Sequence, residues 1–112
     1  MTQVKTMEHI LEKTLLFDFY GDLLTEHRRE IYEAVVFNDM SLSEAAAEFR
    51  ISRQGIHDLI KRCDEAMEAY EEKLHMISRY LTIKEKIRKL RRTEPSAERQ
   101  ILLDSILEDL DS

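Results

Sequence analysis

The residues best suited to chemistry lie on one side of a predicted helix in the middle of the 112-residue chain. They combine cations, an amide and an imidazole: Arg53, Gln54, His57, Lys61 and Arg62. An arginine makes a bidentate contact with guanine and a glutamine with adenine, while His57 and Lys61, one turn apart, suit phosphate oxygens. Asp58 is an unfavourable neighbour, because a carboxylate repels phosphate. The pattern predicts a nucleic-acid-binding face, and the alternative is an ordinary solvated helix face.

A second group of cations is concentrated in residues 79–92, which carry seven basic residues and one acidic residue. Its members on the predicted helix are Lys84, Lys86, Arg88, Lys89, Arg91 and Arg92, called here the basic arm. A helix of this kind can lie along RNA, an acidic protein surface or an anionic membrane. Residues 93–112 carry six acidic residues and one basic residue, so internal ion pairing with the last helix is the alternative.

Catalytic and metal-binding patterns have little support in the sequence. The four histidines are scattered, and none has a cysteine or carboxylate at the spacing of a zinc site. The single cysteine, Cys63, excludes an intramolecular disulfide and is predicted to be buried packing. The chain contains no glycine-rich phosphate loop and no nucleophile elbow. We therefore predict a protein that is not an enzyme and binds no metal or cofactor.

The elements that position the first group are predicted in residues 41–63, which read as a helix, a short turn and a second helix. Ser41 or Ser43 is expected to cap the first helix, and Glu44 completes a capping box with Ser41. Ser52 is expected to cap the second helix, and Ile51 to fill the corner. The pattern is that of a helix-turn-helix, and a plain αα-hairpin is the alternative.

The remaining sequence also favours helices, since it has two glycines, one proline and apolar residues at helical spacing. A first helix is expected from about Met7 to Leu23, and a second is expected to begin after Thr25 and to end near Asn38 and Asp39. The predicted shared core comprises Phe19, Ile31, Val35, Phe49, Ile56 and Leu59. The expected fold is an all-α helix-turn-helix bundle with a long C-terminal helix and a final short helix. Residues 1–78 are expected to form the helix-turn-helix domain. Residues 79–112 are expected to pack on this domain or on a dimer mate.

The long C-terminal helix carries a predicted dimer seam. No glycine or proline follows Cys63 until Pro95, and apolar residues alternate at spacings of three and four. The seam comprises Met67, Tyr70, Leu74, Ile77 and Leu81. A shift in apolar phase predicts a bend near residues 76–82. A helix of roughly 28 residues would be about 42 Å long, which is too long for a core of this size to cover. We therefore expect a homodimer, and the alternative is that the last helix covers the seam.

Charge and hydropathy limit the partners. The formal net charge is −6, and residues 1–78 carry 9 basic and 16 acidic residues. An acidic domain with a small basic patch is expected to bind DNA weakly or only at low salt. No apolar run approaches the length of a membrane span, and the N-terminal residues lack the apolar core of a signal peptide. These features predict a cytoplasmic protein.

The stretch LTEHRREIYEAVVFNDMSLSEAAAEFRISRQGIHDLIKRCDEAMEAYEEKL, with LLFDFYGDLLT at its upstream end, closely resembles the bacterial YlxM family over about residues 10–80. Its motif is also similar to region 4 of sigma factors. The resemblance implies an all-helical, dimeric regulatory protein linked to the signal recognition particle pathway. Two functions remain open: binding of DNA or of the particle RNA, and a non-nucleic-acid adaptor that docks on the particle's GTPase or its receptor.

The chain departs from the family pattern at the turn, where Arg50 replaces the usual glycine or asparagine. A left-handed backbone there would cost about 1 kcal/mol for a non-glycine residue. Gly55, inside the second helix, is expected to cost a similar amount relative to alanine. Together they predict a recognition helix that is not optimised for stability.

Overall fold

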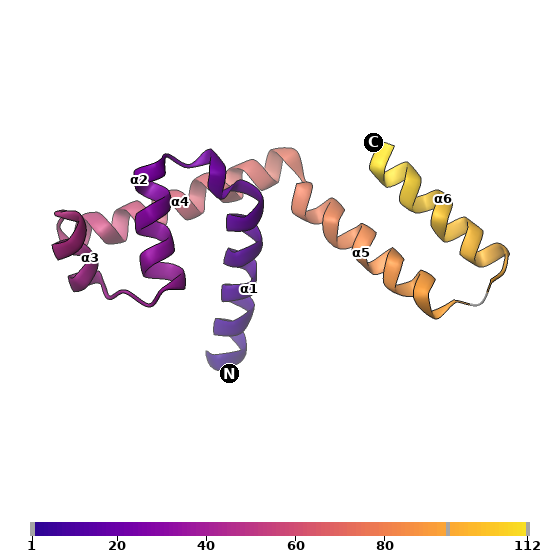
Figure 1. Ribbon diagram of the computed structural model, residues 1–112, viewed down its shortest axis with the longest axis horizontal. Helices are drawn as coiled ribbons and strands as arrows, with labels where there is room; N and C mark the ends of the chain where they lie inside the picture. The colour runs from indigo at the N-terminus through magenta and orange to yellow at the C-terminus, as the bar shows by residue number, and fades with distance from the viewer. Residues whose placement is uncertain (1, 94, 112) are drawn as a thin grey trace. The chain divides into compact units, whose positions relative to one another are not determined.

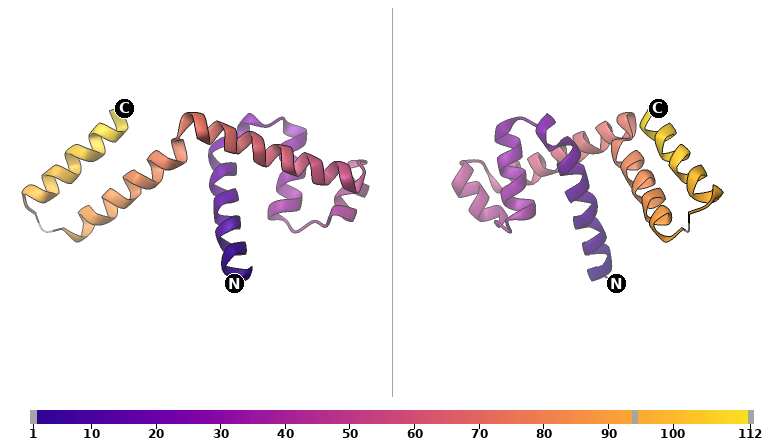
Figure 2. Two further views of the ribbon diagram at one scale, coloured as in Figure 1. Left: turned by 180° about the vertical axis from the view of Figure 1, so that it is seen from behind. Right: turned by 45° about the vertical axis from the view of Figure 1, so that its right-hand side comes forward.

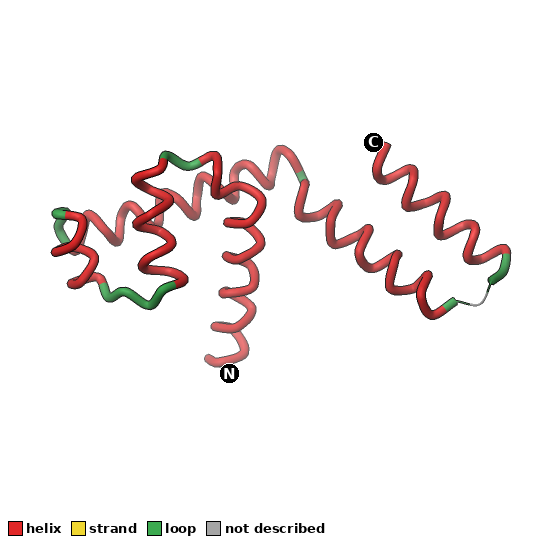
Figure 3. The backbone as a smooth tube through the Cα atoms, in the orientation of Figure 1, coloured by secondary structure: helices red, strands yellow, loops and turns green. Residues whose placement is uncertain are grey.

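The computed structural model of the protein describes residues 2–93 and 95–111, which form helices and no β-strand (Figures 1 and 3). The helices are α1 (Thr2–Tyr20), η1 (Gly21–Leu23), α2 (Glu26–Tyr32), η2 (Glu33–Phe37), α3 (Leu42–Phe49), α4 (Arg53–Leu74), α5 (Met76–Arg92) and α6 (Ala97–Asp111). The prediction of an all-α helix-turn-helix protein is confirmed. The chain divides into two compact units between Leu74 and His75, whereas the sequence placed the boundary after residue 78.

The predicted helix starts are present in the first unit. The Thr25 hydroxyl caps α2 and accepts a hydrogen bond from the backbone N–H three residues later. Ser41 and Glu44 form the capping box of α3, with both reciprocal bonds at 3.0 Å. The Ser52 hydroxyl accepts a bond of 2.9 Å from the Gly55 N–H in the first turn of α4. Each cap satisfies a backbone donor that a helix start leaves unpaired.

The second helix ends differently from a regular α-helix. α2 continues into the π-helical segment η2, where the Asn38 N–H donates to the Glu33 carbonyl five residues earlier. Asp39 then adopts a positive φ of 57°. The predicted end near Asn38 and Asp39 is confirmed, but the π-turn has no signal in the sequence.

The helix-turn-helix surrounds one apolar cluster. Its fully buried members are Ile31 from α2, Ala45 from α3 and Ile56 from α4. Val35, Phe49 and Leu59 pack against this cluster, as predicted. The remaining predicted core residue, Phe19, is half-buried, and its ring centroid lies 6.3 Å from that of Tyr20.

Polar contacts attach α1 and α2 to α4, which both helices cross (Figure 2). Asp64 on α4 accepts hydrogen bonds from the Tyr32 hydroxyl at 2.5 Å and from Lys13 Nζ at 2.9 Å. Nearer the end of α4, Glu71 accepts a bond of 2.6 Å from the Tyr20 hydroxyl. Burial raises the pKa of Tyr32 well above its usual range, and the Asp64 carboxylate raises it further. Hydrogen bonds to a charged group each contribute roughly 1.5–3 kcal/mol.

The predicted continuous helix after Cys63 is wrong. α4 ends at Leu74, and His75 adopts a left-handed conformation with φ 54° and ψ 28° before α5 begins. The break therefore precedes the predicted bend near residues 76–82. Histidine is enriched among the non-glycine residues that adopt this conformation, but it is a weaker signal than glycine.

In the second unit, α5 and α6 form an antiparallel hairpin (Figure 1). Lys86 on α5 reaches across to α6, with Nζ 2.7 Å from Asp109 Oδ2 and 2.6 Å from Ser105 Oγ. Ile106 is buried on the inner side of α6. The helix break predicted at residues 93–96 lies between α5 and α6, and Glu94 within it is outside the described residues.

Candidate nucleic-acid interface

The corner between α3 and α4 has the geometry of a helix-turn-helix (Figure 3). Arg50 adopts a left-handed conformation with φ 57° and ψ 45°. The N–H groups of Arg50 and Ile51 both donate to the Ala46 carbonyl. These bonds satisfy a carbonyl at the end of α3 and turn the chain into α4. The structure thus retains the turn although a non-glycine residue occupies it.

Gly55 supports this corner rather than weakening it. A Cβ placed at Gly55 would lie 2.6 Å from Ile51 Cγ2 and 3.0 Å from Ser52 Oγ. The first distance is about 1 Å shorter than a normal contact between carbon atoms. The interpretation of Gly55 as an uncompensated cost is therefore wrong, because an alanine there would displace the residue that fills the corner.

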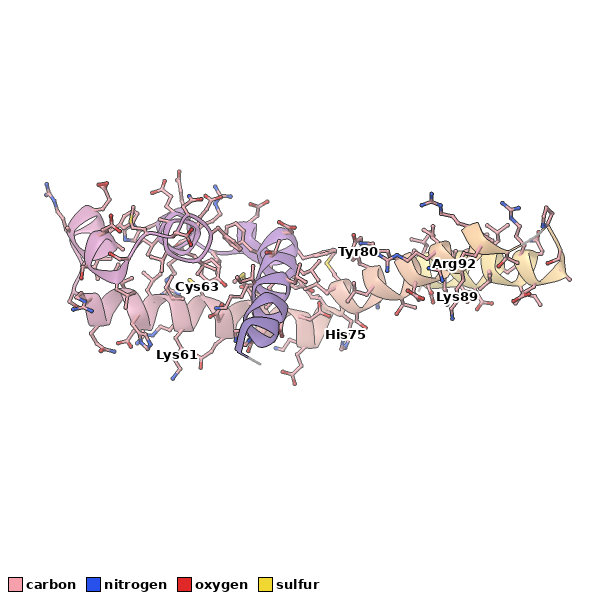
Figure 4. The ribbon with its side chains drawn as sticks, turned by 90° about the horizontal axis from the view of Figure 1, so that it is seen from below. Lys61, Cys63, His75, Tyr80, Lys89 and Arg92 are labelled. Carbon is pink, nitrogen blue, oxygen red and sulfur yellow. The ribbon has the colours of Figure 1, made fainter. Side chains whose placement is uncertain are left out.

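All five predicted contact residues on α4 are exposed. Arg53, Gln54 and His57 line a shallow depression together with Leu42 at the start of α3. Lys61 points away from the body of the unit, on the opposite side of α4 from buried Cys63 (Figure 4). Burial raises the pKa of the Cys63 thiol, which agrees with the predicted packing role.

Asp58 interrupts this exposed face. Its Oδ1 accepts a hydrogen bond of 2.9 Å from Gln54 Nε2 and lies 3.6 Å from His57 Nδ1. The bond from Gln54 holds the pKa of Asp58 below its usual range, and His57 lowers it further. Asp58 therefore remains negative and accepts a hydrogen bond from the Gln54 amide, the group that would contact adenine. Gln54 can contact a base only after its hydrogen bond to Asp58 breaks.

Carboxylates also surround the face. Glu44 and Glu48 on α3 are exposed, as are Glu65, Glu68 and Glu72 further along α4. Such a distribution confines the positive potential to the N-terminal turns of α4. This distribution of charge supports contact with a few phosphates. It opposes contact with a long stretch of the nucleic-acid backbone.

The basic arm divides into two groups in the structure. Lys86 is turned inward to Asp109, so this residue makes the internal ion pair that was the alternative for the basic arm. The other five members are exposed. Among these, Lys84, Arg88 and Arg91 border a shallow groove whose apolar lining includes Ile83 and Ile87. The sequence did not predict this groove, because the packing of α6 determines which side of α5 is open.

The predicted dimer seam is not one exposed stripe. Met67 is fully buried, and the Tyr70 ring packs 5.9 Å from that of Tyr20 on α1. Ile77 is also buried, whereas Leu74 and Leu81 are about half exposed. The spacing of apolar residues predicts the seam, but spacing alone cannot show that α1 covers part of α4.

Among the described residues, no helix combines the length and apolar character needed to cross a membrane. Over the same part of the chain, no three histidine, cysteine or carboxylate side chains are placed to hold one metal ion.

The capped helices, the corner and the exposed start of α4 define a helix-turn-helix protein. The model of a family described as "Putative helix-turn-helix protein, YlxM / p13 like" matches residues 7–106. The chain therefore belongs to the YlxM/p13-like family, in agreement with the resemblance noted in its sequence.

Individual relatives agree with this assignment. The UPF0122 protein of Caldanaerobacter subterraneus subsp. tengcongensis is 44% identical over 84 residues, which cover 75% of this chain and 72% of the relative. The UPF0122 protein of Halalkalibacterium halodurans is 38% identical over 107 residues, covering 92% and 98%. That of Listeria welshimeri is 48% identical over 75 residues, covering 63% and 68%.

Proposed function

We propose that this protein is a regulatory protein of the signal recognition particle pathway that binds nucleic acid through the N-terminal turns of α4. The observation that carries the proposal is the preserved corner, which leaves Arg53, His57 and Lys61 exposed along one side of α4. In helix-turn-helix proteins, residues at the start of the second helix reach base edges while neighbouring cations contact phosphate.

Each side chain has a distinct role in this proposal. Arg53 is placed for a guanine contact and Gln54 for an adenine contact once it leaves Asp58. Lys61 and Arg62 hold phosphates further along α4. Because few cations take part, binding is modest in affinity, and the slope of log affinity against log salt is about −0.9 for each phosphate held.

A second function is favoured by the carboxylates around this face. In that case the protein is an adaptor that docks on the particle's GTPase or its receptor without binding nucleic acid. Glu44, Glu48 and Asp58 would then pair with cations of the partner, and Arg53 and Lys61 would lie at the edge of a protein interface.

The two functions are separated by binding titrations at low salt with random duplex DNA and with the particle RNA of the same organism. The variants are Arg53→Ala combined with Lys61→Ala, and Lys73→Ala as a matched control on the exposed last turn of α4. We expect the double variant to weaken binding by about tenfold or more and the control to resemble wild type. Unchanged binding in the double variant would exclude the α4 face. Absence of binding to both nucleic acids would favour the adaptor.

A further inference from the structure

We propose that α5 lies along the surface of an anionic phospholipid bilayer, with its shallow groove facing the lipid. The groove belongs entirely to the second unit of the chain. Its lining residues are Tyr80, Ile83, Lys84, Ile87, Arg88 and Arg91. This binding goes beyond the proposed function, because it uses a surface other than the start of α4 and a partner other than nucleic acid.

The apolar part of the groove is a short strip along α5. It consists of Tyr80, Ile83 and Ile87, which fall within about 60° of one another around the helix. Tyr80 and Ile87 are 41% and 44% exposed, although both are large. Exposed apolar surface with a polar rim marks a site of contact with a protein or a membrane.

Three cations border this strip on one side. Lys84, Arg88 and Arg91 lie about 20–80° beyond Tyr80 around the helix. Lys84 Nζ is 5.5 Å from the centroid of the Tyr80 ring, so its aliphatic stem runs along the strip. Arg88 Nη1 is 3.8 Å from Glu85 Oε2, which is too long for a strong charge-assisted hydrogen bond. The charged ends of these flexible side chains can therefore reach phosphates beside the strip.

Exposed carboxylates of α6 face away from the groove. Lys86 and Asp109 mark the sides on which the antiparallel helices α5 and α6 meet (Figure 1). Viewed from its own N-terminus, α5 carries the apolar strip about 60–120° clockwise from Lys86. Viewed in the same way, α6 carries Asp104, Glu108 and Asp111 about 100–160° counterclockwise from Asp109. Because the helices are antiparallel, these opposite rotations place the strip and the three carboxylates on opposite faces of the hairpin.

An anionic bilayer fits the groove better than RNA or a protein helix does. RNA phosphates would neutralise the cations but would leave the apolar strip in water. An amphipathic protein helix docks into a hydrophobic groove, whereas the described lining of this groove comes from α5 alone and offers no second wall. A bilayer surface presents lipid phosphates and acyl chains at adjacent depths, so it binds the cations and covers the strip together.

Cosedimentation of the full chain with lipid vesicles tests this proposal. The vesicles contain either phosphatidylcholine alone or phosphatidylcholine mixed with phosphatidylserine. We expect wild type to bind the mixed vesicles at about 0.1 M salt. Binding to the neutral vesicles should be about a hundredfold weaker, since three cations lose their partners and the strip is too short to hold the protein alone.

Two double variants on opposite sides of α5 test the cations. Lys84→Gln with Arg91→Gln should weaken binding to the mixed vesicles about thirtyfold. Lys89→Gln with Arg92→Gln is the matched control, because these exposed cations lie about 150° around α5 from the strip. They are roughly 10 Å further from the lipid, about one Debye length at about 0.1 M salt, so their loss should weaken binding about threefold or less.

Two single variants test the apolar strip. Ile87→Gln should weaken binding about tenfold, because it removes an apolar side chain from the lipid contact. Ile101→Gln is the matched control, since Ile101 is 67% exposed but lies on the carboxylate face of α6. This control should bind like wild type. Circular dichroism checks that every variant keeps the helical content of wild type.

Several results would overturn the proposal. Wild type that does not bind the mixed vesicles, or that binds neutral vesicles equally well, would do so. Equal losses in the two charge variants would show that net charge, rather than the groove, controls binding. Unchanged binding in Ile87→Gln would show that the strip does not enter the lipid. Wild type that binds RNA but no vesicles, and loses the RNA with Lys84→Gln and Arg91→Gln, would assign the groove to nucleic acid instead.

Discussion

Replacing Gly55 by alanine should destabilise the protein, although alanine is the better helix former. Alanine inside a helix is favoured over glycine by about 1 kcal/mol. Here its Cβ would lie 2.6 Å from Ile51 Cγ2, and the two atoms must separate by about 1 Å to reach a normal contact. Ile51 packs against the buried cluster of Ile31, Ala45 and Ile56, so it has little room to move.

The expected size follows from these opposing terms. Overpacking in a filled core costs about 1–3 kcal/mol, which exceeds the gain in helix propensity. We therefore expect Gly55→Ala to lower the free energy of unfolding by up to about 2 kcal/mol. Urea denaturation followed by circular dichroism measures this change, at one protein concentration for all variants because self-association would shift the midpoint.

A double-mutant cycle isolates the collision. In an Ile51→Ala background the Cγ2 atom is absent, and Gly55→Ala should then become neutral or stabilising by up to about 1 kcal/mol. An increase in stability for Gly55→Ala with Ile51 in place would refute the account of the corner. Equal effects in both backgrounds would also do so, because they would show that Ile51 is not the obstructing residue.

Three further predictions concern stability. Arg50→Gly should stabilise the protein by about 1 kcal/mol in urea denaturation, since glycine adopts the left-handed conformation without strain; a loss of stability would contradict the assigned turn. Tyr32→Phe should destabilise by about 1–3 kcal/mol, because Asp64 loses a hydrogen-bond donor. The raised pKa of Tyr32 adds stability that is complete below about pH 10 and is lost as the pH rises further, so the variant should show a weaker alkaline decline. Backbone and hydroxyl bonds from Ser41 lower the pKa of Glu44, so its contribution should be present above about pH 4.3 and disappear as the pH falls through the lowered value; Glu44→Gln should flatten that part of the stability profile, and an unchanged profile would argue against the capping box.

Local signals in the sequence predicted the helix-turn-helix. Ser41, Ser52 and Thr25 cap the helices that they were expected to cap, because a cap depends only on the next three residues. Ile51 and Ile56 also pack as predicted, since the apolar positions of two short helices and a tight turn leave few arrangements.

Features that depend on distant packing could not be predicted. His75 lies within an unbroken heptad pattern, so only the weak preference of histidine for a left-handed backbone marks the end of α4 there. Met67 has the spacing of a seam residue, but its burial depends on the rest of the fold. Lys86 resembles its neighbours in sequence, and only the register of α5 against α6 distinguishes it by placing Asp109 within reach. The collision that requires Gly55 likewise depends on the rotamer of Ile51.

The salt dependence of nucleic-acid binding tests the central claim most directly. Titrations of wild type, Lys61→Ala and Lys73→Ala over a series of salt concentrations give the slope of log affinity against log salt. If Lys61 holds a phosphate, its removal should reduce the magnitude of the slope by about 1, while Lys73→Ala retains the slope of wild type. Equal slopes for all three proteins, or no binding even at low salt, would contradict nucleic-acid binding through the start of α4.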